Sequence, residues 1–246
     1  MQFRELQREQ LQNGVTLPQT DSLFKLGTDS VLLADFADPP RGAAVCDLCA
    51  GTGAIGLLLL ARDPSLTVTA VELQAPACEI MGRAAADNGL TDRFRVVQGD
   101  LREIRSLLPA GSFRHLVCNP PYYPVGAGFR PENEAQAIAR TELCCTLSEV
   151  CAAAGWLLKT GGSLWMVHLP GRLADLFCAL REAGLEPKRL RLVCPKPEAA
   201  PSLALVKAVR GGKPELKWDA PLILSNPDGS PTEEYKRIYH MGEIEN

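Results

Sequence analysis

The stretch that decides the fold is Cys46-Asp47-Leu48-Cys49-Ala50-Gly51-Thr52-Gly53, which follows two apolar residues and precedes an apolar run. Glycines allow positive φ and let the backbone approach a ligand closely. A short strand, an aspartate and a Gly-x-Gly turn that opens a helix are therefore typical of a nucleotide-binding loop. We expect a strand over 44–47 and a helix over Ala54–Arg62, with the ligand at the end of that strand.

Strands and helices alternate beyond this loop. We expect strands at 66–71, 94–97, 113–118 and 163–168, and helices at 75–88, 141–159 (with Thr141 as N-cap), 172–183 and 232–240. Such alternation is typical of a parallel sheet covered on both faces. Strands at 189–193 and 203–207 are joined only by a proline-rich loop, so they should pair antiparallel. The predicted fold is α/β, a doubly wound, seven-stranded, mostly parallel, Rossmann-like sheet with an antiparallel edge hairpin.

Composition narrows the class of protein. The chain has 246 residues and a net charge of −3, which fits one large domain or a domain with an appendage. Its longest apolar run, 55–61, is too short to cross a bilayer, and residues 1–8 do not resemble a signal peptide. We expect a cytoplasmic protein with reduced cysteines. Cys46 and Cys49 have metal-ligand spacing, but no second such pair follows, so no metal site is predicted.

Acidic residues follow the next two strands. Glu72 ends the second strand about twenty residues beyond the glycines, where an acid that binds a ribose is expected. Asp100, followed by Leu101, ends the third strand at a point where an adenine amino group can be recognised. The carboxyl ends of parallel strands lie at one edge of a sheet, so these residues should line one cofactor site.

The glycines admit two cofactors. Gly51, Gly53 and Gly56 spell G-x-G-x-x-G, which with Glu72 satisfies the dinucleotide fingerprint, so an NAD-dependent oxidoreductase is a remote alternative. S-adenosylmethionine is favoured because Asp47 can meet a cationic aminoacyl group and would repel a pyrophosphate. The second acidic strand end, at Asp100, supports the same cofactor. A loop in which the glycines only shape a turn is the third interpretation.

The fourth strand is followed by Asn119-Pro120-Pro121-Tyr122. Pro121 keeps Pro120 out of the helical region, and both prolines lack an N–H donor. Asn119 Oδ1 and the Pro120 carbonyl can accept the two hydrogens of one planar NH2 group, while Tyr122 stacks on the ring that carries it. The motif predicts a reaction at an exocyclic amine or an amide nitrogen. A proline-rich turn with ordinary packing is the alternative.

With these residues assembled, the chain resembles class I S-adenosylmethionine-dependent methyltransferases that carry this motif. The segment from Leu26 to Leu33, with its Gly27-Thr28-Asp29, is similar to the pocket-closing segment of the bacterial tRNA1(Val) adenine-37 N6-methyltransferase family. Segments 139–142, 157–162, 187–191 and 221–239 also resemble that family. Cys49-Ala50 departs from the Gly-Cys or Gly-Ser of many relatives.

The resemblance implies S-adenosylmethionine as cofactor and N6-methylation of an adenine in tRNA, at position 37 of the anticodon loop of tRNA1(Val). The implied catalytic residues are Asn119, Pro120, Pro121 and Tyr122. The implied cofactor-binding residues are Thr28, Asp29, Asp47, Gly51, Gly53, Glu72, Asp100, Leu101 and Asn119. Thr28 and Asp29 also suit a helix N-cap.

Other functions of the same motif stay open. A protein glutamine N5-methyltransferase would hold a primary amide in the same way, but such enzymes place a helical recognition domain where this chain has only residues 1–43. An rRNA guanine-N2 methyltransferase and a methyltransferase fold that only binds are further alternatives. We expect residues 1–43 to close the cofactor pocket, 44–210 to form the methyltransferase domain and 211–246 to pack on it as a tail.

Two segments are candidates for contact with tRNA. Residues 181–217 contain nine basic and four acidic side chains, which suits a surface that follows phosphates, although a solvated sheet edge would have the same composition. The loop 123–140, with Gly126, Gly128 and Arg130, is a candidate mobile lid over the target. The sequence does not indicate an oligomeric state.

Overall fold

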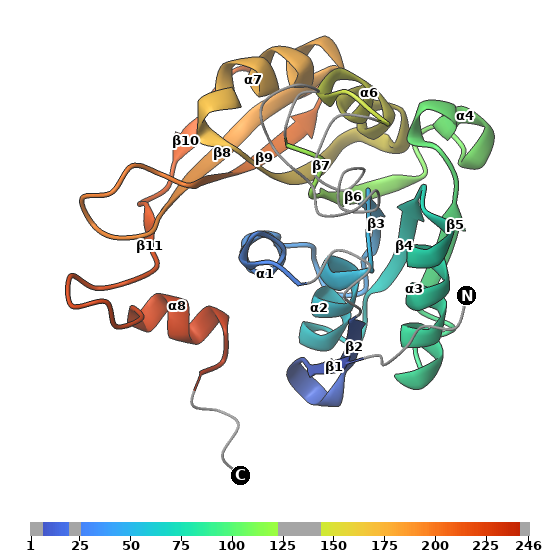
Figure 1. Cartoon of the computed structure of the whole chain (residues 1–246). Coiled ribbons are helices and arrows are strands. Elements are labelled where there is room, and N and C mark those ends of the chain that lie inside the picture. Colours follow the sequence, from blue (N-terminus) through green and yellow to red (C-terminus); the bar gives the residue numbers. More distant parts are fainter. Residues whose placement is uncertain (1–6, 20–25, 123–143, 242–246) are drawn as a thin grey trace.

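The computed structural model describes residues 7–19, 26–122 and 144–241. Seven long strands build the central sheet: β3 (Ala44–Leu48), β4 (Thr67–Glu72), β5 (Phe94–Gln98), β6 (Phe113–Cys118), β7 (Leu158–His168), β8 (Leu185–Cys194) and β9 (Leu203–Arg210). Two short strands, β10 (Lys217–Trp218) and β11 (Leu222–Ile223), lie beside β8, and the order is β10-β8-β9-β7-β6-β3-β4-β5 (Figure 1). The predicted α/β fold is confirmed, with β10 and β11 as additions.

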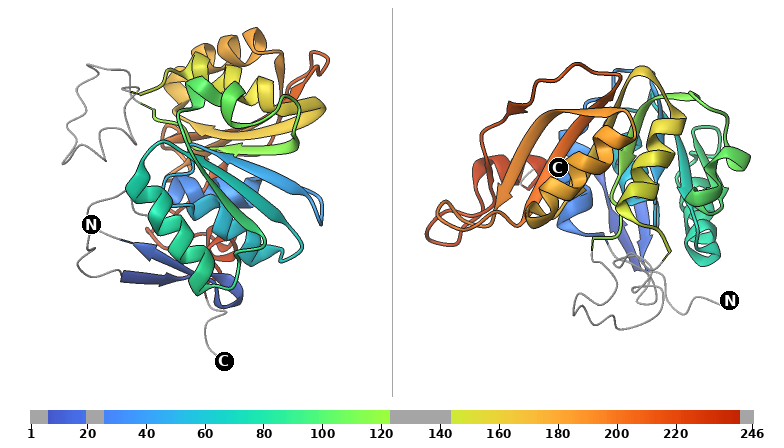
Figure 2. Two further views of the ribbon diagram at one scale, coloured as in Figure 1. Left: turned by 90° about the vertical axis from the view of Figure 1, so that its right-hand side faces the viewer. Right: turned by 90° about the horizontal axis from the view of Figure 1, so that it is seen from above.

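Helices cover both faces of the sheet (Figures 1 and 2). One face packs against α1 (Thr28–Phe36), α2 (Ala54–Arg62), α3 (Ala75–Asp87) and α8 (Glu233–Ile238). The other packs against α4 (Ile104–Leu107), α6 (Leu147–Leu157) and α7 (Leu173–Glu182). Short 3₁₀ turns lie at η1 (Gln12–Gly14), η2 (Leu101–Glu103) and η3 (Pro170–Arg172).

Strand β3 shows how the sheet divides the core. Val45 belongs to the cluster on the α1–α2 face, while Cys46 and Leu48 belong to the cluster on the α6 face. Side chains alternate along a strand, so Asp47 points toward α2. A carboxylate therefore stands in a row of apolar side chains at the centre of the sheet, where a charge costs free energy unless it is paired.

The predicted edge hairpin is confirmed and is longer than expected. Strand β9 runs antiparallel to both β7 and β8, whereas β3 to β7 are mutually parallel. The beginning of β9 therefore lies at the same edge as the ends of the parallel strands. That arrangement brings residues just before β9 to the edge where a ligand is expected.

The helix expected over 141–159 is shorter in the structure. Thr146 caps α6, its hydroxyl accepts from Glu149 N, and the Glu149 carboxylate accepts from Thr146 N. This capping box fixes the start of the helix at Leu147, and Cys144 and Cys145 are not helical. Thr141, the predicted cap, lies outside the described residues. The helix ends at Leu157 because β7 begins at Leu158, five residues before the predicted strand.

A hairpin near the N-terminus was not predicted. Strands β1 (Gln7–Gln10) and β2 (Thr16–Gln19) pair antiparallel. Asn88, which ends α3, accepts from Thr16 N at 2.7 Å and donates to Thr16 O at 2.7 Å. These bonds attach the hairpin to the end of α3. Among the described helices, none has the length and apolar character needed to cross a membrane.

Candidate functional site

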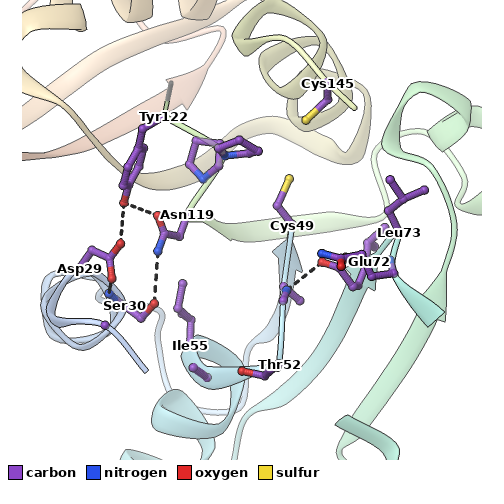
Figure 3. A pocket seen from close by; sticks show the side chains of 18 of the residues that line it. Asp29, Ser30, Cys49, Thr52, Ile55, Glu72, Leu73, Asn119, Tyr122 and Cys145 are labelled. Carbon is purple, nitrogen blue, oxygen red and sulfur yellow. Dashed lines mark hydrogen bonds between the residues drawn. The ribbon is translucent and has the colours of Figure 1, made fainter. Parts of the chain in front are cut away.

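A cavity of about 500 Å³ opens at the carboxyl edge of the sheet (Figure 3). It extends from Asp100, after β5, past the glycine loop and Asn119 to Leu224, after β11. Its size is that of a small-molecule site. The predicted site residues that line it are Thr28, Asp29, Gly51, Glu72, Asp100, Leu101, Asn119, Pro120, Pro121 and Tyr122.

The glycines of the loop have distinct structural roles. Gly51 and Gly53 have φ of 57° and 82°, and Gly53 is the N-cap of α2. A side chain at Gly53 would put its Cβ 2.8 Å from Met81 Cγ, and one at Gly56 would lie 2.7 Å from Phe94 Cε2. Gly56 therefore lets α2 pack closely on the sheet, and the other two turn the chain beside the cavity.

Glu72 connects the ends of β3 and β4. Its Oε2 accepts from Gly51 N and its Oε1 from Gln74 N, each at 2.8 Å. Burial raises the pKa of this carboxyl, and the backbone donors oppose that effect. A carboxylate has about four acceptor positions, so these bonds orient Glu72 and leave capacity for ligand hydroxyls.

Asp47 is placed differently from the other predicted cofactor residues. It lies inside β3, is fully buried, and does not line the cavity. Its Oδ2 accepts from Gly56 N at 3.0 Å, and its Oδ1 has no hydrogen-bond partner in the described part of the chain. Burial raises its pKa to about 7, with a further contribution from Glu72. Asp47 thus holds the start of α2, and direct contact with a cofactor stays a prediction.

Asp100 is paired with a neighbouring arginine, which was not predicted from the sequence. The guanidinium of Arg102 donates to both carboxylate oxygens, with Nη2 2.5 Å from Oδ2. These bonds hold the pKa of Asp100 below its usual range. Asp100 also accepts from Arg102 N and so caps η2. A ligand amine that reached Asp100 would share it with Arg102.

The proline motif is tied to the start of α1. Asn119 Nδ2 donates to Ser30 Oγ at 3.2 Å. The Tyr122 hydroxyl lies 3.0 Å from Asp29 Oδ2 and also contacts Asn119 Oδ1 (Figure 3). Asp29 Oδ1 accepts from Ser30 N at 2.8 Å. Four side chains from segments about ninety residues apart therefore form one polar network on one side of the cavity.

The Tyr122 ring is held from the opposite side. Its edge-on contact with His168 has a centroid distance of 5.4 Å, and Arg172 Nη1 donates to Tyr122 O at 3.3 Å. Burial, and then the charge of Arg172, lowers the pKa of His168 to about 4. The imidazole is therefore neutral near pH 7, and the tyrosine packs against an uncharged ring.

The C-terminal tail reaches the same helix. Tyr239, just after α8, lies near Thr28, and burial raises the pKa of Tyr239 to about 12 while its contact with Thr28 opposes that effect. Its ring packs on Tyr235 at 4.5 Å. The tail therefore lies close to Thr28, which also lines the cavity.

An apolar end of the cavity was missed by the sequence analysis. Leu169 follows β7, Ser202 directly precedes β9, Leu203 is the first residue of β9, and Leu224 follows β11. All four line the cavity, and their strands lie beyond β6 in the sheet. Leu169 carried the signal used for Glu72, a position just after a parallel strand. The others lacked one, because their place depends on β9 running backwards and on β11 joining β8.

Cysteines also line the cavity. Cys49, Cys144 and Cys145 are lining residues. Cys49 adopts φ of 60°, a conformation in which glycine is less strained. Its pKa, like that of Cys145, is raised by contact with a neighbouring thiol and by burial. In the described parts of the chain, no three His, Cys, Asp or Glu side chains are arranged to bind a metal.

The basic segment 181–217 is largely neutralised. Five of its nine basic side chains form ion pairs: Arg181–Glu186, Lys188–Glu215, Arg189–Asp219, Arg191–Glu234 and Lys207–Asp38. Three of the acids lie outside the segment. A count of charges within residues 181–217 therefore could not reveal these ion pairs. Lys196 is exposed in the loop between β8 and β9, at the edge that carries the cavity. The candidate lid, 123–140, lies outside the described residues.

Comparison with known proteins gives consistent results. Residues 22–174 match the methyltransferase small domain family. A tRNA1(Val) (adenine(37)-N6)-methyltransferase from Porphyromonas gingivalis is 30% identical over 166 residues, which cover 65% of this chain and 64% of that protein. The chain thus spans less than two thirds of that relative.

Two further proteins are similar. A ribosomal protein uL3 glutamine methyltransferase from Bordetella pertussis is 38% identical over 85 residues, which cover 35% of this chain and 28% of that protein. The crystal structure of a predicted O-methyltransferase from Agrobacterium tumefaciens superposes with a TM-score of 0.71 at 24% identity, covering 87% of this chain and 96% of the other. At that identity the likeness establishes the fold.

Proposed function

The chain belongs to the methyltransferase small domain family, and on that premise we propose that it transfers a methyl group from S-adenosylmethionine to the N6 amino group of an adenine in tRNA. The target we propose is position 37 of the anticodon loop of tRNA1(Val), as in the name of the relative from Porphyromonas gingivalis. The observation that carries the proposal is the place of Asn119 and Tyr122 in the cavity lining. They follow β6, which lies in the sheet between β3–β4–β5, with Glu72 and Asp100 at their ends, and β7–β9–β8, beside Leu169, Leu203 and Leu224.

The polar end fits S-adenosylmethionine. The buried Asp47 carboxylate lies behind the glycine loop with one oxygen that has no described partner, which suits a cationic aminoacyl group nearby. Glu72, already oriented by Gly51 and Gln74, suits the ribose hydroxyls. When bound, S-adenosylmethionine supplies the methyl group and its own leaving group. We propose Thr28, Asp29, Asp47, Gly51, Gly53, Glu72, Asp100, Leu101 and Asn119 as its binding residues.

The apolar end suits the ring of the target. Leu169, Leu203 and Leu224 line the cavity on the far side of Tyr122. An uncharged heteroaromatic ring buries both faces in such a space, and a base stacked on an aromatic side chain gains about 1–3 kcal/mol. A glutamine side chain offers much less surface to these leucines. This observation favours a nucleobase over the protein amide of the uL3 methyltransferase, which stays the second candidate.

In this proposal, the protein catalyses methyl transfer by positioning the two reacting groups. Asn119 Oδ1 and the Pro120 carbonyl accept the two hydrogens of N6, which stabilises the positive charge that grows on nitrogen as the methyl group arrives. Tyr122 stacks on the base, and Pro121 stiffens the segment. Holding nitrogen and methyl group at near-attack distance removes up to about 7–11 kcal/mol of the barrier. An anticodon-loop adenine is unpaired, so bringing it into the cavity is inexpensive.

The flanking segments have supporting roles in this proposal. Residues 1–43 close the cofactor side, which is supported by Thr28 and Asp29 lining the cavity, and residues 44–210 form the catalytic domain. Residues 211–246 pack on it as a tail, supported by Leu224 in the cavity and by the buried Ile238. The segment 181–217, in which Lys196 is exposed at the cavity edge, and the loop 123–140 are the proposed tRNA contacts. The tRNA substrate implies a place in the cytoplasm.

The test is a transfer assay with unmodified tRNA1(Val) and labelled S-adenosylmethionine, followed by nucleoside mass spectrometry. We expect N6-methyladenosine with wild-type protein and a rate about 10²–10³-fold lower with Asn119→Ala, by analogy with removal of one oriented transition-state contact. Calorimetry should show that Asn119→Ala still binds S-adenosylmethionine. Methylated guanosine, or label only in a ribosomal protein glutamine, would refute the proposed substrate.

A further inference from the structure

One hydroxyl on the acceptor side of the cavity has two acceptors. Tyr122 Oη lies 3.0 Å from Asp29 Oδ2 and within hydrogen-bonding distance of Asn119 Oδ1. A phenol carries one proton, so Tyr122 donates to only one of these oxygens at a time. The choice matters because Asn119 Oδ1 is the atom that must accept a hydrogen of the target NH2 group.

A donor from Tyr122 weakens Asn119 as an acceptor. A hydrogen bond to Oδ1 draws electron density from the amide oxygen and occupies one of its two acceptor positions. The target N–H then meets a poorer acceptor, at the atom where growing positive charge must be stabilised. Asp29 offers the tyrosine a better partner, since a hydrogen bond to a carboxylate is roughly twice as strong as one to a neutral group.

We propose that Asp29 is a positioning residue that accepts the Tyr122 proton and so leaves Asn119 Oδ1 free to receive the target N–H. In the free protein the proton is shared between the two acceptors. When an NH2 group donates to Asn119, the hydroxyl turns fully to Asp29. The inference rests on the proposed function only in requiring an NH2 target, and it does not depend on which molecule carries that group.

The surroundings hold the three side chains in place for this exchange. Asp29 Oδ1 is fixed by Ser30 N at 2.8 Å, which directs Oδ2 toward Tyr122. Asn119 Nδ2 donates to Ser30 Oγ at 3.2 Å, which leaves Oδ1 directed toward the Tyr122 hydroxyl. The His168 ring packs on Tyr122 and limits its movement. Only the hydroxyl proton needs to change direction, so the exchange requires no rearrangement of the chain.

A double-mutant cycle tests the coupling. Asp29→Ala and Tyr122→Phe are made singly and together, and kcat for methyl transfer is measured with saturating S-adenosylmethionine. We expect Asp29→Ala to lower kcat about 10-fold in the wild-type background and less than about 2-fold in the Tyr122→Phe background, a coupling typical of residues in one network. Asp29→Asn should fall between, because an amide oxygen accepts more weakly than a carboxylate.

The control is Asp35→Ala on the same helix. Asp35 pairs with Arg237 at 3.1 Å, and its replacement should affect kcat equally in both tyrosine backgrounds. If Asp29 acts only by binding the cofactor, Asp29→Ala lowers S-adenosylmethionine affinity and has the same effect on kcat in both backgrounds. That result would overturn the inference.

A readout without turnover separates this inference from the proposed function. The side-chain amide signal of Asn119 in NMR should shift in Asp29→Ala, because the tyrosine loses Asp29 as an acceptor and donates more to Oδ1. The same substitution should leave the signal unchanged in the Tyr122→Phe background. If the protein shows this pattern but methylates no tRNA, the role of Asp29 stands and the proposed substrate is refuted. An Asn119 signal insensitive to Asp29 refutes the inference whatever the substrate is.

Discussion

The two sides of the cavity are built in different ways. On the cofactor side, glycine φ angles, backbone donors and buried carboxyl groups shape the loop, and the contacts join β3 to β4 and β3 to α2. On the acceptor side, side chains of α1 contact the segment after β6 across the chain. Backbone geometry thus sets the first side, and side-chain hydrogen bonds set the second.

The difference predicts different responses to substitution. Changes on the cofactor side should alter folding stability and cofactor affinity together, because the loop is part of the β3–α2 core. Changes on the acceptor side should alter turnover and leave stability and cofactor affinity largely intact. Three substitutions, taken in order of expected size, test that separation.

Asp47→Asn tests the buried carboxylate. The pKa of Asp47 rises from 3.8 to about 7 on folding, so the folded protein holds a proton that the unfolded chain releases. Its contribution to stability is complete below pH 3.8 and is lost as pH rises to 7, by about 1.4 kcal/mol per unit and about 4 kcal/mol at most. Asparagine does not titrate and still accepts from Gly56 N.

Denaturant unfolding of both proteins from pH 4 to 8 measures this loss. The stability of wild type relative to Asp47→Asn should fall across that range and level off above about pH 7. Glu72 interacts with Asp47, so the difference reports the titration of Asp47 together with its interaction with Glu72. A flat difference would show that Asp47 stays charged in the folded protein, and the cofactor side would then lack the buried acid assigned to it.

Gly56→Ala tests the close approach of α2 to the sheet. The added Cβ would lie 2.7 Å from Phe94 Cε2 and 2.9 Å from Val68 Cγ1. Overpacking of this kind destabilises by about 1–3 kcal/mol, and S-adenosylmethionine affinity should fall with it, because Gly56 N also binds Asp47.

Gly82→Ala is the matched control for this substitution. Gly82 lies in α3, where a Cβ meets nothing within 4 Å, so alanine should stabilise by about 0.4–1 kcal/mol. Thermal unfolding and calorimetry of both variants provide the comparison. Unchanged stability and affinity in Gly56→Ala would mean that the loop tolerates displacement of α2. That result would contradict the conclusion that backbone packing sets the cofactor side.

The same contrast explains what could be predicted from sequence. Gly51, Glu72 and Asp100 were found because each follows a strand directly, and the order of parallel strands fixes their edge. Leu203 and Leu224 could not be found, since their place depends on the direction of β9 and on β11.

Pairings between distant segments were also hidden from the sequence. Ser30 on Asn119 is a contact between side chains 89 residues apart that no periodicity encodes. The local pair of Arg102 with Asp100 was not predicted either. The ion pairs of the segment 181–217 depend on acids brought from elsewhere, such as Asp219 and Glu234. The predicted start of the helix 141–159 was wrong for a local reason. Thr146 and Glu149 form a capping box, so the helix begins after Thr146 and not after Thr141.

Ser30→Ala tests the acceptor side with the smallest change. Ser30 is 4% exposed, and its Oγ is the described partner of Asn119 Nδ2 at 3.2 Å. Without the hydroxyl, the Asn119 amide can rotate, so Oδ1 is less often directed at the target. We expect kcat to fall about 10-fold, which corresponds to loss of one hydrogen bond of about 1.4 kcal/mol. S-adenosylmethionine affinity and the unfolding midpoint should stay close to wild type.

Ser30→Thr restores the hydroxyl and should recover most of the rate, whereas Ser30→Cys, with a weak acceptor of similar size, should behave like alanine. Equal losses in all three variants would mean that Ser30 acts through packing, and the acceptor side would then depend on close packing as the cofactor side does.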